Sequence, residues 1–92
     1  MFLDKKYSIS SSVILQTIDE ESLLMDEETH LFYELNSTGA FFWEILQEYD
    51  VLSDAFSEIV ECFDVSKEQL ENDFSKFISD LIEQGVIEID EQ

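Results

Sequence analysis

The stretch from His30 to Tyr49 constrains the fold of this chain more than any other, because a strand pattern runs directly into a helix pattern. Its first part, His30–Leu35, is rich in aromatic residues, which favour a half-buried pleated surface. Asn36–Gly39 follows, with three polar side chains that can accept the free amides of a helix start. Apolar residues then recur at helical spacing up to Tyr49. A sheet and a helical layer are therefore expected to share one core at this joint.

Two further strands are predicted before the joint. Val13–Ile18 is a β-branched run and Ser22–Met25 a short apolar run, with polar turns at Asp19–Glu21 and Asp26–Thr29. Such short connections between consecutive strands imply an antiparallel meander.

The third strand, His30–Leu35, alternates between two faces. We expect one set of side chains to face the helices, namely Leu31, Tyr33 and Leu35. The other set, His30, Phe32 and Glu34, is expected on the outer face. A large apolar side chain such as Phe32 on this solvent-facing side calls for an explanation.

Three helices are predicted after the strands. The first covers about Ser37–Tyr49, and the second covers about residues 51–63 with Ser53 as its cap. The third has the clearest start, because Ser66 and Gln69 have the spacing of a capping box. Gly85 is expected to end it in a left-handed conformation.

The two ends of the chain are less constrained. Residues 1–12 are interpreted as a lead-in, in which Tyr7 and Ile9 form a short edge strand or stay mobile. Val86–Ile89 is either a terminal strand or an extended tail packed on the core. We therefore expect a single α+β domain over residues 1–92, resembling a winged helix, with a three-stranded antiparallel sheet followed by three helices.

The charge of the chain is extreme, with 23 acidic residues against 4 lysines and a formal net charge of −19. Such a surface repels the phosphates of nucleic acids and anionic membranes. The predicted third helix, which reads DNA in many winged helices, is itself mostly acidic here. The expected partner is a neutral or basic protein or peptide, and solubility alone is the alternative explanation of the charge.

Residues that could support catalysis or hold a metal or cofactor are scarce. The single Cys62 lies on an apolar helical pattern and is expected to be buried, and His30 is expected to be solvated. No zinc spacing, EF-hand loop or phosphate loop is present, so we expect a non-enzyme without cofactors or metals. No signal peptide or membrane-spanning stretch is visible, which predicts a cytoplasmic protein.

Binding is the remaining role, and a small open sheet offers an edge for it. An edge strand with unpaired amides can accept an added peptide strand. The third strand could form a groove with the third helix, rimmed by Phe32, Phe74 and Phe77 and by the carboxylates of Asp73 and Asp80. Ordinary core packing remains the alternative for Phe74 and Phe77.

The segment Leu35-Asn36-Ser37-Thr38-Gly39-Ala40, followed by Phe42-Trp43 and Ile45-Leu46, resembles the LNxTG segment of PqqD-like proteins. These are the precursor-peptide recognition elements of ribosomally made, modified peptides, and the resemblance extends from about Val13 to Ile89. It implies three strands with three helices, and a leader peptide bound as an extra strand against the third strand, beside the third helix. The motif itself is expected to shape the joint rather than touch the ligand.

Carried onto this chain, the resemblance implies two groups of peptide-binding residues. The strand contributes Leu31, Phe32, Tyr33 and Glu34, and the helix contributes Asp73, Phe74, Lys76, Phe77, Asp80 and Leu81. Replacing Phe77 with aspartate is expected to abolish binding without unfolding the domain.

Family members present the leader to a radical-SAM enzyme or, in lasso-peptide pathways, to a leader peptidase. The acidic turn before the aromatic strand favours the lasso type, and the unusual acidity implies a basic leader or enzyme. Two alternatives stay open: an acidic mimic that blocks a DNA-binding protein, and a structural domain that dimerises through the free strand edge. We accordingly expect a monomer or weak dimer.

Overall fold

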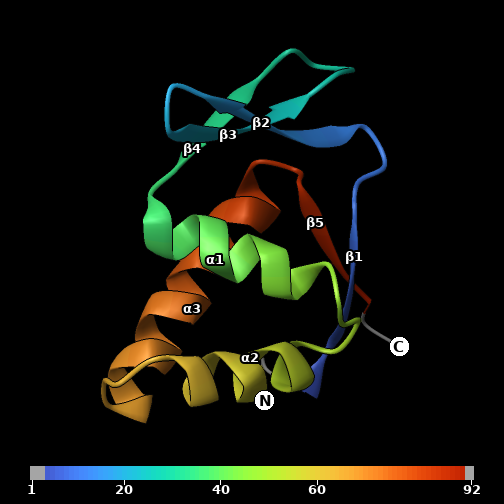
Figure 1. The fold of residues 1–92 in the computed structure, drawn as a ribbon. Coiled ribbons are helices and arrows are strands. Elements are labelled where there is room, and N and C mark those ends of the chain that lie inside the picture. Colours follow the sequence, from blue (N-terminus) through green and yellow to red (C-terminus); the bar gives the residue numbers. More distant parts are fainter. Residues whose placement is uncertain (1–3, 91–92) are drawn as a thin grey trace.

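The computed structural model describes residues 4–90 and contains five strands and three helices (Figure 1). In chain order they are β1 (Lys6–Ile9), β2 (Val13–Ile18), β3 (Glu21–Asp26), β4 (Phe32–Leu35), α1 (Ser37–Leu46), α2 (Leu52–Cys62), α3 (Lys67–Glu83) and β5 (Ile87–Asp90). Strands β2, β3 and β4 form an antiparallel sheet in that order, and the three helices follow. The predicted α+β arrangement of a three-stranded sheet and three helices is confirmed.

The turn between β2 and β3 is tighter than predicted. Asp19 and Glu20 both have left-handed backbone conformations, with φ of 49° and 72°, and Ile18 pairs directly with Glu21. Two left-handed residues in succession match the right-handed twist of a two-residue hairpin turn. Glu21 therefore belongs to β3 and not to the turn.

The turn between β3 and β4 explains why the last strand of the meander begins at Phe32 rather than His30. The Asp26 carboxylate accepts the amides of Glu28 (2.9 Å) and Thr29 (3.4 Å), and these amides together with the Ser12 hydroxyl lower the pKa of Asp26. His30 then adopts a left-handed φ of 62°. Leu31 lies between this turn and β4, and its side chain is 57% exposed at a hollow that Leu24 and Val86 also line.

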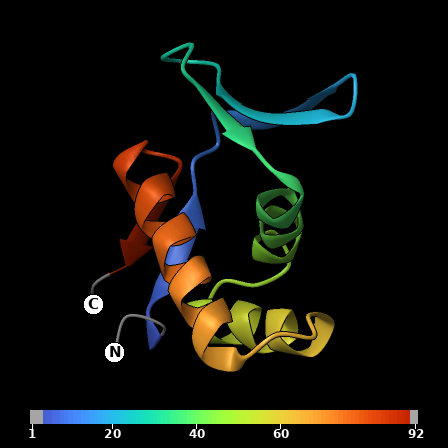
Figure 2. The same cartoon turned by 90° about the vertical axis from the view of Figure 1, so that its left-hand side faces the viewer.

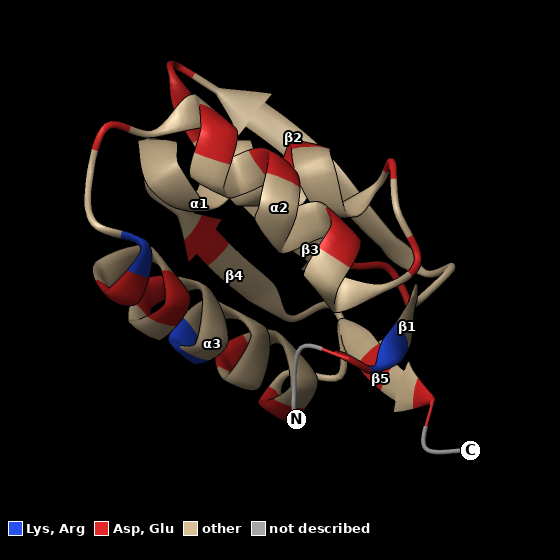
Figure 3. Cartoon of the chain, turned by 90° about the horizontal axis from the view of Figure 1, so that it is seen from below, with Lys and Arg blue, Asp and Glu red and all other residues tan. Residues whose placement is uncertain are grey.

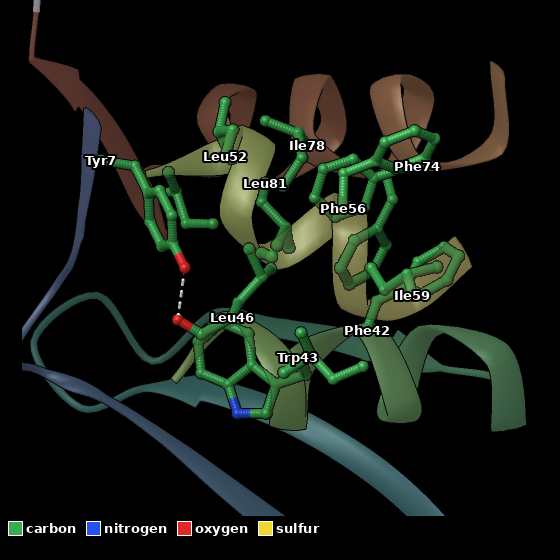
Figure 4. Close-up of a cluster of buried hydrophobic side chains, with 14 of the residues drawn as sticks. Tyr7, Phe42, Trp43, Leu46, Leu52, Phe56, Ile59, Phe74, Ile78 and Leu81 are labelled. Carbon is green, nitrogen blue, oxygen red and sulfur yellow. Dashed lines mark hydrogen bonds between the residues drawn. The ribbon is translucent and has the colours of Figure 1, made fainter. Parts of the chain in front are cut away.

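A second, two-stranded sheet joins the two ends of the described chain. Strand β1 pairs antiparallel with β5, in a register that places Tyr7 opposite Ile89. The Tyr7 ring is buried, and its hydroxyl donates a 2.6 Å hydrogen bond to the Leu46 carbonyl (Figure 4). The supposed lead-in therefore contributes a core residue, and the C-terminal segment is a strand.

Replacing Tyr7 with phenylalanine should lower the free energy of unfolding at pH 8 by about 1–2 kcal/mol, because a buried hydrogen bond is lost. Burial raises the pKa of Tyr7, and the charges of Asp50 and Asp54 raise it further. The unfolded phenol ionises near pH 10 while the folded one stays protonated, so this contribution is complete below that pH and falls above it. Urea denaturation at pH 8 and pH 10.5 should show a smaller alkaline loss in the variant, and an equal loss would contradict the assignment.

The starts and ends of the helices follow the capping signals in most places. The side-chain Oδ1 of Asn36 accepts the Gly39 amide at 2.7 Å, and the Ser66 hydroxyl accepts the Gln69 amide at 3.2 Å, which confirms the predicted start of α3. Gly85 follows α3 with a φ of 78°, also as predicted. The first helix, however, ends at Leu46 and not at Tyr49.

The start and end of α2 differ from the prediction. Ser53 lies within the helix, so the prediction that it caps α2 is wrong. The Leu52 amide instead donates to the Lys5 carbonyl at 3.0 Å, which means that the β1 segment serves in place of a side-chain cap. Cys62 is exposed, contrary to the prediction. The buried face of α2 carries Leu52, Ala55, Phe56 and Ile59, and the next residue packed against the core is Phe63 rather than Cys62.

One hydrophobic cluster lies between the three helices, and both sheets contribute to it (Figure 4). Its largest fully buried side chains are Phe42, Phe74, Leu24, Leu46, Leu52, Ile59, Ile78, Leu81 and Ile87. The helices all lie on one side of the β2–β3–β4 sheet, as Figures 1 and 2 show from two directions. The part of its helix-facing side formed by Leu24 and Leu35 therefore belongs to the core, and no described helix covers its outer side.

Candidate functional site

Strand β4 is an edge strand with one free side. It pairs with β3, and no other strand of residues 4–90 pairs with it, since the C-terminal strand β5 is taken up by β1. The edge that the resemblance implied for an added strand is thus open in this structure.

The register shows which backbone groups point outward from this edge. The Asp26 amide donates to the Leu31 carbonyl at 3.0 Å, immediately before the paired residues Met25 and Phe32. Hydrogen-bonded and non-hydrogen-bonded pairs alternate in an antiparallel ladder, so Tyr33 exchanges its backbone hydrogen bonds with Leu24. The amides and carbonyls between these pairs, those of Phe32 and Glu34, therefore face the free side.

A cleft of about 420 Å³ lies along the same edge, between the β4–α1 joint and α3. One wall comes from the joint and the other from α3. The lining residues are Tyr33, Glu34, Leu35, Asn36, Thr38, Gly39, Phe42, Asp73, Lys76, Phe77 and Asp80.

Three aromatic rings form the apolar part of the cleft. Phe77 makes edge-on contacts with Tyr33 and Phe42, with ring centroids 6.5 and 5.6 Å apart. Its side chain is only 9% exposed, so it presents an edge to the cleft while most of the ring belongs to the core. Apolar side chains of a ligand could rest on this edge, but the ring itself is structural.

Gly39 allows α1 to approach Phe77 closely. A Cβ atom at this position would lie 3.3 Å from both Phe77 Cε1 and Asn36 Oδ1, and 3.4 Å from Leu35 Cδ2. Asn36 caps the same helix, so the Leu35–Ala40 motif fixes the angle between strand and helix. Asn36, Thr38 and Gly39 also line the cleft, which the sequence interpretation did not anticipate, although the motif marked their position.

Replacing Gly39 with valine should lower the free energy of unfolding by about 1–3 kcal/mol, because two added methyl groups and a Cβ must displace the Phe77 ring. The matched control is Thr38→Val, an exposed neighbour on the same turn that gains no volume and should change stability by less than about 0.5 kcal/mol. Urea denaturation of both variants measures the difference. Equal stabilities would show that the close approach of α1 and α3 is not tight.

The cleft carries more negative than positive charge. Glu34, Asp73 and Asp80 line it against the single amine of Lys76 (Figure 3 shows α3 with its charges). The Tyr33 hydroxyl donates a 3.4 Å hydrogen bond to Asp80 Oδ2 and so connects β4 with α3. Burial raises the pKa of Tyr33, with a further contribution from Asp80, so this phenol stays a donor throughout the neutral range.

The structure separates the residues proposed from sequence into three groups. Those that line the cleft are Tyr33, Glu34, Asp73, Lys76, Phe77 and Asp80. Leu31 and Phe32 are exposed, and they border a small neighbouring hollow instead. Phe74 and Leu81 have no exposed surface and pack in the core.

The position of Phe77 changes the expectation for its aspartate variant. A carboxylate at a site that is 9% exposed and packed between two rings would be desolvated without a partner. We therefore expect Phe77→Asp to destabilise the fold, so that loss of binding in this variant would not locate the cleft.

Nothing in the described chain forms a metal centre or a membrane span. Within residues 4–90, no three His, Cys, Asp or Glu side chains are grouped so as to hold a metal ion. None of the described helices has the length and apolar character needed to cross a bilayer.

Comparison with known proteins gives a family and two similar structures. The family model described as Coenzyme PQQ synthesis protein D (PqqD) matches residues 21–87. The solved structure "TbiB1 in Complex with the TbiA(beta) Leader Peptide" superposes with a TM-score of 0.76 at 25% identity, covering 88% of this chain and 94% of that one. "Lasso peptide synthetase B1 complexed with the leader peptide" superposes with a TM-score of 0.75 at 18% identity, covering 90% and 98%.

No curated protein matches the sequence. The PqqD match spans β3, β4 and all three helices, and it includes both walls of the cleft. The chain therefore belongs to the PqqD family.

Proposed function

We propose that this protein binds the leader region of a ribosomally made precursor peptide as an added strand on β4. The observation that carries the proposal is the open edge of β4 beside a cleft of about 420 Å³. An extended peptide placed there would complete the ladder through the backbone groups of Phe32 and Glu34.

Affinity and specificity would come from different parts of this site. Main-chain hydrogen bonds along β4 bind any extended segment, whereas the cleft selects among side chains. The edges of Phe42 and Phe77 favour an apolar residue, and the carboxylates of Asp73 and Asp80 favour a basic one. We infer that the leader alternates an apolar with a basic contact over the length of the cleft.

The comparisons support this proposal. Both similar structures are described as complexes with a leader peptide, and both align over nearly their full length with this chain. The two leader-bound proteins therefore share most of the fold of this chain.

We further propose that the protein is a non-catalytic adaptor that presents the leader to a leader peptidase of a lasso-peptide pathway. One similar structure is named as a lasso peptide synthetase component. The acidic turn that precedes β4, Asp26–Glu28, also favours this type over the radical-SAM type. An activity assay distinguishes the peptidase from the radical-SAM enzyme. Each candidate enzyme is incubated with the full-length precursor peptide, with and without this protein, and cleavage or modification of the precursor is measured.

The direct test is titration with a synthetic peptide that matches the leader of a candidate precursor peptide from the same genome. We expect saturable binding at micromolar or lower concentration by isothermal titration calorimetry. Amide hydrogen exchange by NMR adds a residue-level readout: Phe32 and Glu34 should become protected on binding. Tyr33 and Leu35, already bonded to β3, should change little.

A scrambled leader of the same composition is the control for charge-driven association. Absence of saturable binding, or equal binding of the scrambled peptide, would contradict the proposal. If neither the Phe32 amide nor the Glu34 amide became protected from exchange, the strand-addition geometry would be contradicted. The acidic-mimic alternative predicts this negative result together with capture of a DNA-binding protein.

A further inference from the structure

The outer face of the β2–β3–β4 sheet carries a row of half-buried and exposed apolar side chains that no described helix covers. Directly paired residues point to the same side of a sheet, and Leu24 and its partner Tyr33 point toward the helices. The neighbouring row, Ile14–Met25–Phe32, therefore lies on the outer face. Phe32 is 59% exposed, and its position on this face confirms the expectation from sequence.

Other apolar residues extend this row across the face. Leu23 lies beside it between Gln16 and Glu34, and Ile18 lies one step further along β2 with 53% of its side chain exposed. Figures 1 and 2 show the helices on the opposite side of this sheet. A contiguous apolar surface of this kind, with polar groups at its borders, is characteristic of a protein–protein contact.

The borders of this face have a single sign of charge. Residues 13–36 contain seven carboxylates and neither lysine nor arginine, while the four lysines of the chain stand at positions 5, 6, 67 and 76. The carboxylates belong to Asp19, Glu20, Glu21, Asp26, Glu27, Glu28 and Glu34. They occupy the two turns at the ends of the strands and the edge at β4.

This charge excludes several occupants of the face. A second copy would bring its own carboxylates against these seven, and like charges in close contact cost several kcal/mol. Nucleic acid and anionic lipid are repelled for the same reason. The leader peptide, by the proposal above, takes the edge of β4 and not this face.

We propose that the outer face of the β2–β3–β4 sheet is the docking surface for the enzyme that acts on the bound peptide. Its complement on the enzyme would be an apolar patch bordered by lysine and arginine. This inference rests on the proposed function, because it assigns the second partner of the same adaptor. It separates the two tasks spatially, with the leader on the strand edge and cleft and the enzyme on the sheet face.

The test uses the full chain and the purified leader peptidase that processes the same precursor peptide. The double variant Ile14→Gln/Met25→Gln removes the β2 and β3 members of the apolar row and changes no residue of β4 or of the cleft lining. We expect its affinity for the peptidase, measured by biolayer interferometry, to fall at least tenfold. The thermal melting profile and leader binding show whether the variant is folded. Its affinity for the leader should stay within about twofold of the wild-type affinity.

The matched control is Val65→Gln, which makes a comparable apolar-to-polar change at a site 48% exposed between α2 and α3. It should leave peptidase binding unchanged, while raising sodium chloride from 50 to 500 mM should weaken the wild-type complex. Peptidase binding by the double variant at wild-type strength would overturn the docking surface. So would wild-type dimerisation that the double variant abolishes in light scattering. Failure of leader binding in the wild type would instead count against the proposed function.

Discussion

Replacing Glu34 with proline should weaken leader binding about 30- to 100-fold while leaving the protein folded. The Glu34 amide points to the free side of β4, where it has no partner in the described structure and would donate to an added strand. Proline removes that donor and places its ring where the incoming backbone would lie. A lost main-chain hydrogen bond and an obstructed ladder together cost about 2–2.7 kcal/mol, which gives the expected change in affinity.

The fold should tolerate this change because of the same geometry. Proline is accepted in edge strands where its nitrogen faces away from the sheet. The hydrogen bonds of β4 with β3 involve Tyr33 and Leu35, so they remain. Circular dichroism and urea denaturation should show a loss of stability of no more than about 1 kcal/mol.

Two variants make this prediction specific. Glu34→Thr removes the carboxylate but keeps the amide, so it should retain most of the leader affinity if the backbone is the contact. Tyr33→Pro instead removes an amide bonded to Leu24 and a cleft side chain, and it should destabilise the sheet. Equal losses of affinity in Glu34→Pro and Glu34→Thr would indicate that the side chain, and not strand addition, holds the leader.

The elements that the sequence predicted best are those whose signals are local. The β-branched run Val13–Ile18, the cap formed by Ser66 and the left-handed Gly85 each depend on a few neighbouring residues, and each is confirmed. The start of β4 was predicted two residues early, because the left-handed His30 in the turn after Asp26 delays the strand to Phe32. Tyr7 could not be placed, because its burial depends on pairing with β5, more than 75 residues away in the chain.

The candidate site shows the same limit at the level of side chains. Phe74 and Phe77 lie on one face of α3 and have equal weight in the sequence pattern. Their environments are decided by how α3 is rotated against β4 and α1, which turns Phe74 into the core and leaves an edge of Phe77 at the cleft. Helical spacing identifies the buried face, but it does not show where that face meets another element.

The second large effect is expected for Phe42→Ala, which should lower the free energy of unfolding by about 3–5 kcal/mol. The Phe42 ring is 2% exposed and makes edge-on contacts with Phe63, Phe74 and Phe77, at centroid distances of 5.9, 5.6 and 5.6 Å. Truncation removes one ring from the centre of this group and opens a cavity beside the cleft. Small domains have a total stability of about 5–15 kcal/mol, so the variant should be close to unfolding at physiological temperature.

Phe32→Ala is the matched control, since it makes the same chemical change at a ring on the outer face of the sheet. It removes few packing contacts and should change the free energy of unfolding by less than about 1 kcal/mol. Urea denaturation monitored by the fluorescence of the buried Trp43, which lies next to Phe42 in the chain, measures both. If the two variants lost equal stability, the joint between β4 and α1 would not be the centre of the core. The wall of the cleft that α1 supplies would then lack the rigid support that a preformed peptide site needs.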